Sequence, residues 1–341
     1  MEDSTNAGRK PLLLVNLLRL LQAHRAVFKQ ERVYMRGVAL VLAEVMAFGR
    51  HTVTQLLQVL GVTEGDWSSW RRLWSKPRVE EERLAQQLVC ESLVHVSSEE
   101  YYVIGTDGTQ IPRTSGRMPG VSWLKSPRTP VFSPGIHRAQ RFVHGCWFTP
   151  MANGYSRAIP LRFVPAFPAK AKAGLVAACK EWEAGIAFVQ WLRMQLDCLG
   201  REAQPVLYLA DSSYETAELW KALPPHVTAA LRTARNRALY AYLPPSQRKR
   251  RRLYGLRVAR PADWFVQRKG YTTCRLLIRG RMRQLRYRLE GPVVCRGAPD
   301  VPLFLLIVGG QTTGSYSLTL TLLLSGISCV IQPNSYKVES G

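Results

Sequence analysis

The sequence predicts an α/β protein in which an all-helical N-terminal domain precedes a mixed β-sheet with flanking helices. Helix-forming runs occupy most of the chain up to about residue 98. Short apolar runs rich in β-branched and aromatic residues begin at residue 101, as expected of β-strands. One long run with its apolar residues on a single helical face separates two groups of these strands. The domains predicted on this basis are 1–98, 99–310 and an unusual tail, 311–341.

The charge of the chain indicates a polyanionic partner. The 341 residues include 47 Lys and Arg against 24 Asp and Glu, which gives a formal net charge of +23. Such an excess attracts DNA or RNA more often than any other partner. The basic residues are spread along the chain, which favours a nucleic-acid-binding protein over an ordinary basic enzyme.

The cysteines and the N-terminal segment indicate an intracellular protein. Seven cysteines stand singly, without CxxC spacing, and their number is odd. This argues against a disulfide framework and a structural zinc site, and indicates a reducing cytosol. The apolar run 11–21 is too short to span a bilayer, so we expect an amphipathic helix there. The predicted location is the cytoplasm, in association with the nucleoid and without membrane contact.

Residues 52–74 have the pattern of a helix-turn-helix. A first helix leads to a glycine turn at Gly61, and a second helix follows with Thr63 as its cap. Arg71 and Arg72 lie on the second helix, where DNA phosphates and base edges would be within reach. The alternative is a plain pair of helices packed on their neighbours.

The elements after residue 100 follow the order of an RNase H-like core. A helix between two strands is a crossover, which lets the later strand pair parallel to an earlier one. In that core the first and fourth strands are neighbours. Asp107 and Asp211, about a hundred residues apart, would then lie side by side at the ends of their strands. The predicted strands are 101–107, 143–148, 158–164, 205–211 and 227–232, and the helix is 174–199.

Two carboxylates at the ends of neighbouring strands suit a hard divalent cation. Mg²⁺ takes oxygen ligands and is usually held by a few carboxylates together with substrate phosphate. Two such ions catalyse phosphodiester cleavage in many nucleases, but a pair of ions needs a third carboxylate, expected from a helix beyond the last strand. The alternative is that each aspartate is a turn residue or a helix cap, because Asp107-Gly108-Thr109 also has the pattern of a tight turn.

Several segments of the core resemble a known family. The runs Thr106–Gly116 and Leu209–Thr216, which contain the two aspartates, are similar to the aspartate motifs of DDE transposases from bacterial insertion sequences. The resemblance extends from about residue 35 to about residue 310, with motifs in matching order and spacing. Further stretches that look like one group of this family are 133–141, 154–163 and 232–240.

The resemblance implies Mg²⁺- or Mn²⁺-dependent cleavage of transposon ends and strand transfer into target DNA. Asp107 would bridge two ions, and Asp211 would ligate one of them. The partner would be double-stranded DNA, and members of the family usually act as homodimers. The basic segment 234–300 would contact DNA phosphates. Within it, the run Arg248, Lys249, Arg250, Arg251 and Arg252 is either a DNA contact, which we favour, or a solvated charge run.

The chain departs from the family after about residue 310. Members continue past a strand like 303–308 into a helix that supplies the third acid, but residues 312–332 carry no charge and lack helical periodicity. Glu290 and Asp300 precede the expected position, and Glu339 is two residues from the end, so the third acid is unknown. We expect a truncation or reading-frame change near residue 311.

Three functions are compatible with these observations. The first is a DDE transposase that is inactive as it stands because the third acid is missing. The second is a non-catalytic DNA-binding remnant that competes with an intact transposase for the transposon ends. The third is an RNA-binding or RNA-cleaving enzyme on the same core, against which the helix-turn-helix pattern weighs modestly.

Overall fold

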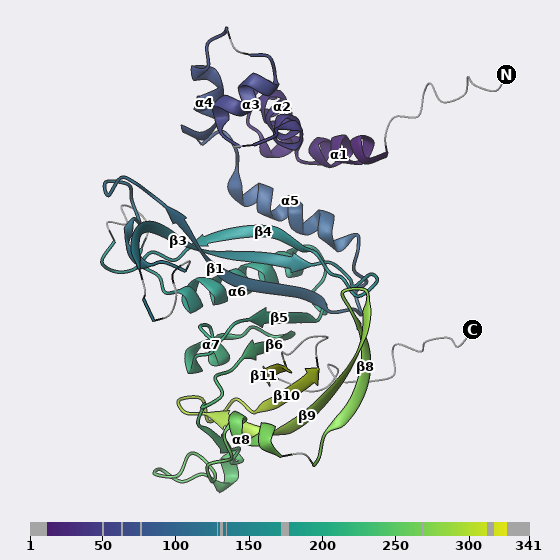
Figure 1. The fold of residues 1–341 in the computed structure, drawn as a ribbon, viewed down its shortest axis with the longest axis vertical. Coiled ribbons are helices and arrows are strands. Elements are labelled where there is room, and N and C mark those ends of the chain that lie inside the picture. Colours follow the sequence, from purple (N-terminus) through teal and green to yellow (C-terminus); the bar gives the residue numbers. More distant parts are fainter. Residues whose placement is uncertain are drawn as a thin grey trace, which may run out of the picture. The chain divides into compact units, whose positions relative to one another are not determined.

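A computed structural model describes residues 12–49, 51–62, 64–75, 77–127, 129, 132–133, 135–171, 177–267, 269–311 and 317–325. The chain divides into two compact units, residues 1–92 and 93–341 (Figure 1). None of the helices in the described ranges combines the length and apolar character that crossing a bilayer requires.

The unit of residues 1–92 is built from helices around a small apolar core. Leu40 of the second helix packs with Leu56 and Leu57 of the third, and Trp67 and Trp70 pack against this cluster. Apolar residues at helical spacing therefore hold these short helices together, since helices of this length are marginal alone. The helices are α1 (Leu12–Ala23), the 3₁₀ turn η1 (Arg25–Val27), α2 (Glu31–Met46), α3 (Val53–Val59), α4 (Ser68–Ser75) and α5 (Glu81–Leu93).

Residues 52–75 form two helices joined by a turn, with one correction to the sequence prediction. Thr52 accepts a hydrogen bond from the backbone N–H of Gln55 at the start of α3, and Gly61 has a positive φ of 70° after it. The second helix begins at Ser68, later than a cap at position 63 implies. Asp66 accepts the first helical N–H there, from Ser68 at 2.8 Å. Residue 63 itself lies outside the described residues.

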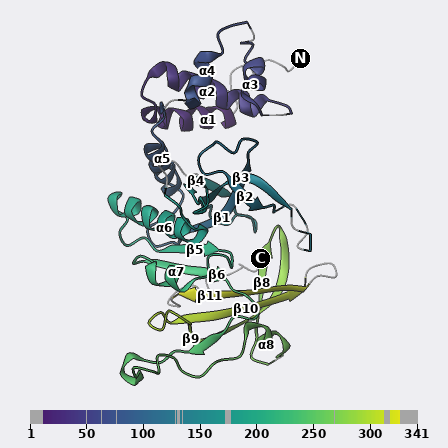
Figure 2. The same ribbon diagram turned by 90° about the vertical axis from the view of Figure 1, so that its left-hand side faces the viewer.

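The unit of residues 93–341 is dominated by one large mixed β-sheet (Figures 1 and 2). Its order is β2-β3-β1-β5-β6-β11-β10-β9-β7, with β4 beside β3 and β8 beside β9. The strands are β1 (Tyr102–Pro112), β2 (Ser122–Lys125), β3 (Ile136–Phe148), β4 (Ala158–Pro165), β5 (Val206–Ala210), β6 (Val227–Arg232), β7 (Leu239–Ala241), β8 (Thr272–Ile278), β9 (Arg281–Cys295), β10 (Leu303–Gln311) and β11 (Ser317–Ser325). The helices are α6 (Glu181–Cys198), α7 (Ala217–Ala222), the 3₁₀ turn η2 (Pro245–Gln247) and α8 (Pro261–Val266).

Five of these strands have the connectivity that the sequence predicts. Strand β1 pairs antiparallel with β3, and β3 pairs antiparallel with β4. Helix α6 then crosses over, and β5 pairs parallel with both β1 and β6. The result is a mixed sheet consistent with an RNase H-like fold, with the first and fourth strands of the core as neighbours.

Three predicted boundaries within this core are wrong. Strand β3 begins at Ile136 and not at residue 143. Strand β1 does not end at Asp107, because β3 is long enough to pair with it as far as Pro112. Gly108 and its neighbours are therefore extended and do not form a tight turn. Helix α6 begins at Glu181 and not near residue 174; the backbone N–H before it, of Lys180, is bound by the side chain of Glu183 at 2.8 Å.

The segment after β6 adds strands to the sheet. Strands β8 and β9 form a hairpin, and Arg279 at its turn donates a hydrogen bond to the carbonyl of Gly154, in the connection between β3 and β4. Strand β11, from the uncharged tail, lies between β6 and β10. Its Ser, Thr and Leu side chains suit a strand inside a sheet, where charged side chains would be costly. The rest of that tail, 326–341, lies outside the described residues.

Helix α6 packs tightly on the sheet where a glycine allows close approach. A Cβ built on Gly145 of β3 would lie 2.4 Å from Cε2 of Phe188, whose ring is completely buried. The absence of a side chain at this position thus lets the Phe188 ring rest directly on the strand backbone. Interiors are close-packed, so an added methyl group has no room there.

Gly145→Ala should destabilise the second unit by about 1–3 kcal/mol, because the methyl group forces Phe188 or the strand to move. The measurement is urea unfolding of the purified chain. Gly116→Ala is the matched control, since its nearest atom, Cζ of Arg138, is an ordinary 3.5 Å away. Equal unfolding midpoints for both variants would show that the contact between α6 and β3 adapts.

Candidate functional site

The two aspartates follow the last paired positions of two parallel neighbouring strands. The pairing of β1 with β5 ends at Thr106 and Ala210, and Asp107 and Asp211 are the next residues. Neighbouring strands are about 4.8 Å apart, so the two residues occupy adjacent places where the parallel pairing stops. The sequence separates them by about a hundred positions, and the parallel pairing brings them together.

Both aspartates belong to the sheet face opposite α6. Thr106 lies on the α6 side, because its hydroxyl is 2.6 Å from the buried hydroxyl of Tyr208 and its pairing partner is Gly145 beneath Phe188. Successive side chains of a strand alternate between faces, so Asp107 lies on the other side. The same alternation, counted from Tyr208, assigns Asp211 to that side as well.

The environment of these carboxylates favours a cation. Asp107 and Asp211 are exposed, and within the described part of the chain neither takes part in an ion pair, although the protein carries a net charge of +23. One oxygen of Asp211 accepts the backbone N–H of Ser213, which orients the carboxylate and leaves its other oxygen available. Two unpaired carboxylates at adjacent positions fit the oxygen ligands of one Mg²⁺ or Mn²⁺ that also binds substrate phosphate.

The described residues contain no group of three His, Cys, Asp or Glu side chains arranged to hold a metal ion. A pair of ions needs more carboxylates than two. The two aspartates therefore fit a single cation and do not by themselves fit two.

A histidine and a cysteine lie beside Asp107 on β3. His144 pairs with Asp107 across the strands and stacks on the ring of Phe163 at 4.6 Å. Burial lowers the pKa of His144, and the charge of Asp107 raises it by less. Burial also raises the pKa of the Cys146 thiol. Both groups are therefore neutral near pH 7, and neither offsets the charge of the aspartate. The other histidine of this strand, His137, is 2.7 Å from Gln110 at the end of β1.

Buried hydroxyl groups lie beneath the aspartates on the α6 side. Tyr208 is completely buried, and its hydroxyl contacts that of Thr106. Tyr214, three residues after Asp211, is 1% exposed, and its ring contacts the glycine of α6, Gly185. Burial raises the pKa of both tyrosines, so they stay protonated and act as packing and hydrogen-bonding groups. They connect the segments that carry the two aspartates to α6.

Glu215 anchors the segment after Asp211 to distant parts of the chain. Its carboxylate is 2.8 Å from the guanidinium of Arg237 and accepts a hydrogen bond from the hydroxyl of Thr233 at 3.0 Å. The thiol of Cys295 in β9 lies 3.5 Å from Oε1 of Glu215, the oxygen that also pairs with Arg237. Burial raises the pKa of Glu215, and Arg237 lowers it by less. No pattern in the sequence singled out this residue, although it lies within the 209–216 motif.

A second ion pair lies on the α6 side of β1. Glu181, the first residue of α6, is 3.0 Å from Arg141 of β3. A Cβ on Gly108 would come within 3.1 Å of this carboxylate, so Glu181 lies over the residue that follows Asp107. Glu181 is on the opposite face from Asp107 and already has a partner, so we do not assign it as the third acid. The sequence offered no signal for this pair, because the two residues are far apart in the chain.

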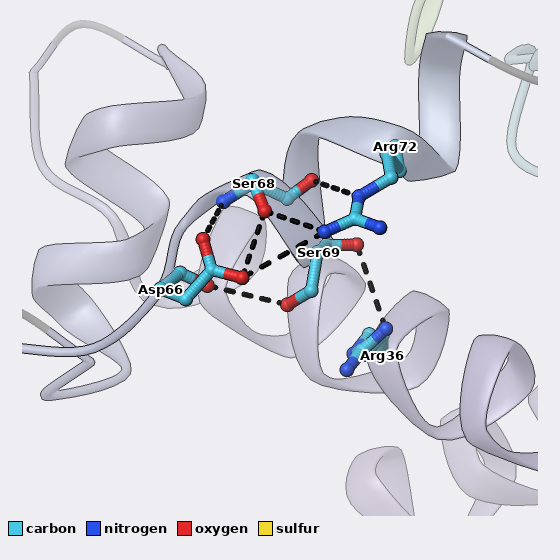
Figure 3. Close-up of polar contacts among 5 residues, drawn as sticks. All are labelled: Arg36, Asp66, Ser68, Ser69 and Arg72. Carbon is cyan, nitrogen blue, oxygen red and sulfur yellow. Dashed lines mark hydrogen bonds and ion pairs between the residues drawn. The ribbon is translucent and has the colours of Figure 1, made fainter.

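The two arginines of α4 that were predicted to contact DNA differ in their contacts within the protein. Figure 3 shows Arg72 turned back toward the start of its own helix, where its guanidinium contacts the hydroxyl of Ser68 at 2.6 Å and lies 3.7 Å from Asp66. Serine hydrogen bonds lower the pKa of Asp66, so it stays charged opposite Arg72. Arg36 reaches the carbonyl of Ser69 in the same network.

Arg71, the neighbour of Arg72 on α4, is also exposed. It is absent from the network around Asp66, so of the two arginines its charge is the one more available to a ligand.

The basic run 248–252 has two parts. Arg248 is only 11% exposed; it donates to the carbonyls of Leu243 and Pro299 and pairs with Asp300, so it holds this loop to the residues after β9. Lys249 and Arg252 exchange backbone hydrogen bonds and form a tight turn. The turn is exposed from residue 249 to 252, which makes it a basic tip suited to phosphate contact.

A comparison with protein families identifies the family of this chain. Residues 26–286, more than half of the chain, match the model of a family described as DDE superfamily endonuclease. The match includes Asp107, Asp211 and the basic tip. A comparison with curated proteins found no match.

The pH dependence of stability should report the burial of Glu215. A raised pKa means that the folded protein binds this proton more tightly than the unfolded chain does. The stabilisation is complete below the ordinary glutamate pKa of 4.5 and decreases as the pH rises from there to the raised value. Glu215→Gln removes this dependence and keeps an acceptor for Thr233.

Denaturant unfolding between about pH 4 and about pH 8 measures it. The wild type should lose stability relative to Glu215→Gln as the pH rises, because burial disfavours the charged form of the carboxyl group. A wild type that gains stability over this range would mean that the pair with Arg237 outweighs the burial.

Proposed function

The chain belongs to the DDE superfamily of endonucleases, and we propose that it derives from a bacterial insertion-sequence transposase. Its reaction would be the metal-dependent cleavage of transposon ends in double-stranded DNA and strand transfer into target DNA. The coarser assignment, a transposase-like nuclease, follows from the family. The type of element, the DNA ends and the working homodimer are parts of the proposal.

One observation carries the proposal. Asp107 and Asp211 follow the last paired positions of two parallel, neighbouring strands, on the same face of the sheet and without an ion-pair partner among the described residues. In the described residues neither carboxylate is held in an ion pair or caps a helix. Asp211 accepts the N–H of Ser213, as a turn residue does, and this leaves its second oxygen for a cation. The arrangement is the one that a divalent cation at a phosphodiester requires.

Asp107 and Asp211 would hold the metal ion in the proposed site. Such an ion, when bound, supplies a Lewis acid that polarises phosphate and lowers the pKa of bound water. The chain's own residues would orient it: the N–H of Ser213 fixes the carboxylate of Asp211, and the contact between Thr106 and Tyr208 fixes the register of the strands. Members of this superfamily typically use divalent metals.

We further propose that the chain as it stands cleaves DNA poorly. No third carboxylate joins the two aspartates within the described ranges, and two carboxylates hold a pair of ions weakly. The same observation favours the second candidate function, a non-catalytic DNA-binding protein that competes for transposon ends. The two functions share the DNA contacts and differ in the chemical step.

Strand cleavage should separate the two functions. With Mg²⁺ or Mn²⁺, the wild type should nick supercoiled plasmid no faster than Asp107→Asn or Asp211→Asn, because the described residues bring no third carboxylate to the two aspartates. Mn²⁺ binding, measured by calorimetry, should be weak in the wild type and lost in both variants.

Glu202→Gln is the matched control, since Glu202 is an exposed acid before β5, at the other end of that strand from Asp211. Robust nicking that Asp107→Asn abolishes would contradict the proposed inactivity and support the metal site. Mn²⁺ binding that survives both aspartate variants would refute the site itself.

DNA binding should depend steeply on salt. Each phosphate contact lowers the slope of log K against log salt by about 0.9. Replacing Arg250 and Arg251 at the basic tip by Ala should therefore weaken binding to any duplex sequence and make that negative slope shallower by about 1–2. Fluorescence anisotropy with labelled duplex at several salt concentrations measures both quantities.

Arg260→Ala is the control for the basic tip. Arg260 is an exposed arginine of the same segment, but its guanidinium is already paired with Asp263 at 3.3 Å. An unchanged slope for the tip variant would mean that residues 249–252 are a solvated run, as in the alternative interpretation.

A further inference from the structure

We propose that the N-terminal unit is a dimerisation unit, in which helix α1 of each copy inserts into an apolar groove of its partner. The inference builds on the homodimer of the proposed function and names its surface. It rests on the surface of residues 12–92 and requires neither the metal site nor DNA.

Helix α1 carries an apolar surface that its own unit does not bury. Nine of its twelve residues are Leu, Val or Ala, and none of the twelve is buried. Leu12 and Leu13 are 76% and 81% exposed, and Leu14 and Leu18 are 40% and 42% exposed. Leu14 and Leu18 are one turn apart and therefore project from the same side of the helix. Apolar helices that fold in water normally bury such a side against a partner.

A groove in the same unit has the size and lining to receive such a helix. Its volume is about 830 Å³, and its lining is mainly apolar, with side chains from α1, α2 and α5. Val41 on its wall is 39% exposed. Side chains that line it include Leu20, His24, Val38, Leu73, Leu84 and Leu88.

One polar atom in the groove lacks a partner. His24 is 8% exposed, and its Nδ1 lies 2.8 Å from the carbonyl oxygen of Leu20. That contact requires a proton on Nδ1, which leaves Nε2 as the ring nitrogen free for another contact. Nε2 is buried and has no hydrogen-bond partner among the described residues, a condition that costs free energy unless an occupant supplies one. Helix α1 carries side-chain amide donors at Asn16 and Gln22.

The charges favour a second copy of this chain as the occupant. Two copies of a protein with net charge +23 repel each other over most of their surfaces, but α1 carries a single charge, Arg19. The groove contains one charge of each sign, Arg78 and Glu81. This neutral patch is therefore a place where like-charged copies can meet. A helix that lies on a lipid surface is instead rich in Lys and Arg on its polar face.

The patch also meets the requirement of two-fold symmetry. In a symmetric dimer the same surface of both copies is in contact, so each copy must present the inserting group and the recess together. Leu20 belongs to α1 and also lines the groove, so helix and groove adjoin. Helix-in-groove recognition uses anchors at i, i+3, i+4 and i+7, and α1 has leucines at 14, 17, 18 and 21.

Sedimentation velocity of the full chain, treated with nuclease and kept at high salt to exclude bridging DNA, tests this interface. The wild type should sediment as a dimer. Leu18→Glu and Val41→Lys should each weaken dimerisation by at least about a hundredfold, because each buries a charge against apolar side chains. Leu256→Glu is the control, since Leu256 is 81% exposed in the other unit; it should remain a dimer.

An equimolar mixture of Leu18→Glu and Val41→Lys gives the sharper result. In the mixed dimer one contact joins the new Glu to the new Lys, and the other contact is wild type. The mixture should therefore recover the dimer that neither variant forms alone. Circular dichroism checks that both variants keep their helices.

Three outcomes would overturn the inference. A monomeric wild type, dimers that persist in both variants, or a monomer that binds vesicles of neutral and acidic phospholipid would each exclude a partner copy. Failure of the metal site is distinguishable, because Asp107→Asn should leave the dimer unchanged.

Discussion

The parallel pairing of β1 with β5 is the constraint on which the candidate site depends. The backbone hydrogen bonds of this pair end at Thr106 and Ala210, and the next residue on each strand is an aspartate. A shift of one residue in this register would move one carboxylate to the opposite face of the sheet. The site is therefore specified by strand register, which other parts of the fold must hold.

Three sets of contacts support that register. The buried contact between Thr106 and Tyr208 joins the two strands on the face opposite the carboxylates. Helix α6 packs through Phe188 on Gly145, and this fixes β3 against β1. Glu215 links the segment after Asp211 to Arg237 and to β9. Burying the Glu215 carboxylate costs desolvation free energy, which its one cationic partner and two further donors offset only in the correct geometry. This requirement favours the native position of the segment after Asp211 over other positions.

Three parts of the molecular surface differ in their charge. Two carboxylates without ion-pair partners in the described residues lie where the parallel pairing of β1 with β5 stops. The protein is strongly basic, and a cation at this place would reduce the mutual repulsion of the two carboxylates. The basic tip at 249–252 is exposed, whereas Arg248 beside it is used to hold the loop. The apolar surface of α1 has almost no charge. Metal, DNA and a second copy of the chain would thus each find a different kind of surface.

The sequence by itself determined the order of elements in the core, because alternating and helical patterns of apolar residues are local. It also showed the DDE-like motifs that contain Asp107 and Asp211, whose role as metal ligands stays a prediction. Tertiary structure decided the extent of β1, since its last residues are extended only because β3 pairs with them. Tertiary structure also decided the place of β11, the partners of Glu215, and the hydrogen bonds and ion pairs of Arg72 and Arg248. These features depend on contacts between residues distant in the chain or on the direction of a side chain. Local periodicity encodes neither such contacts nor side-chain directions.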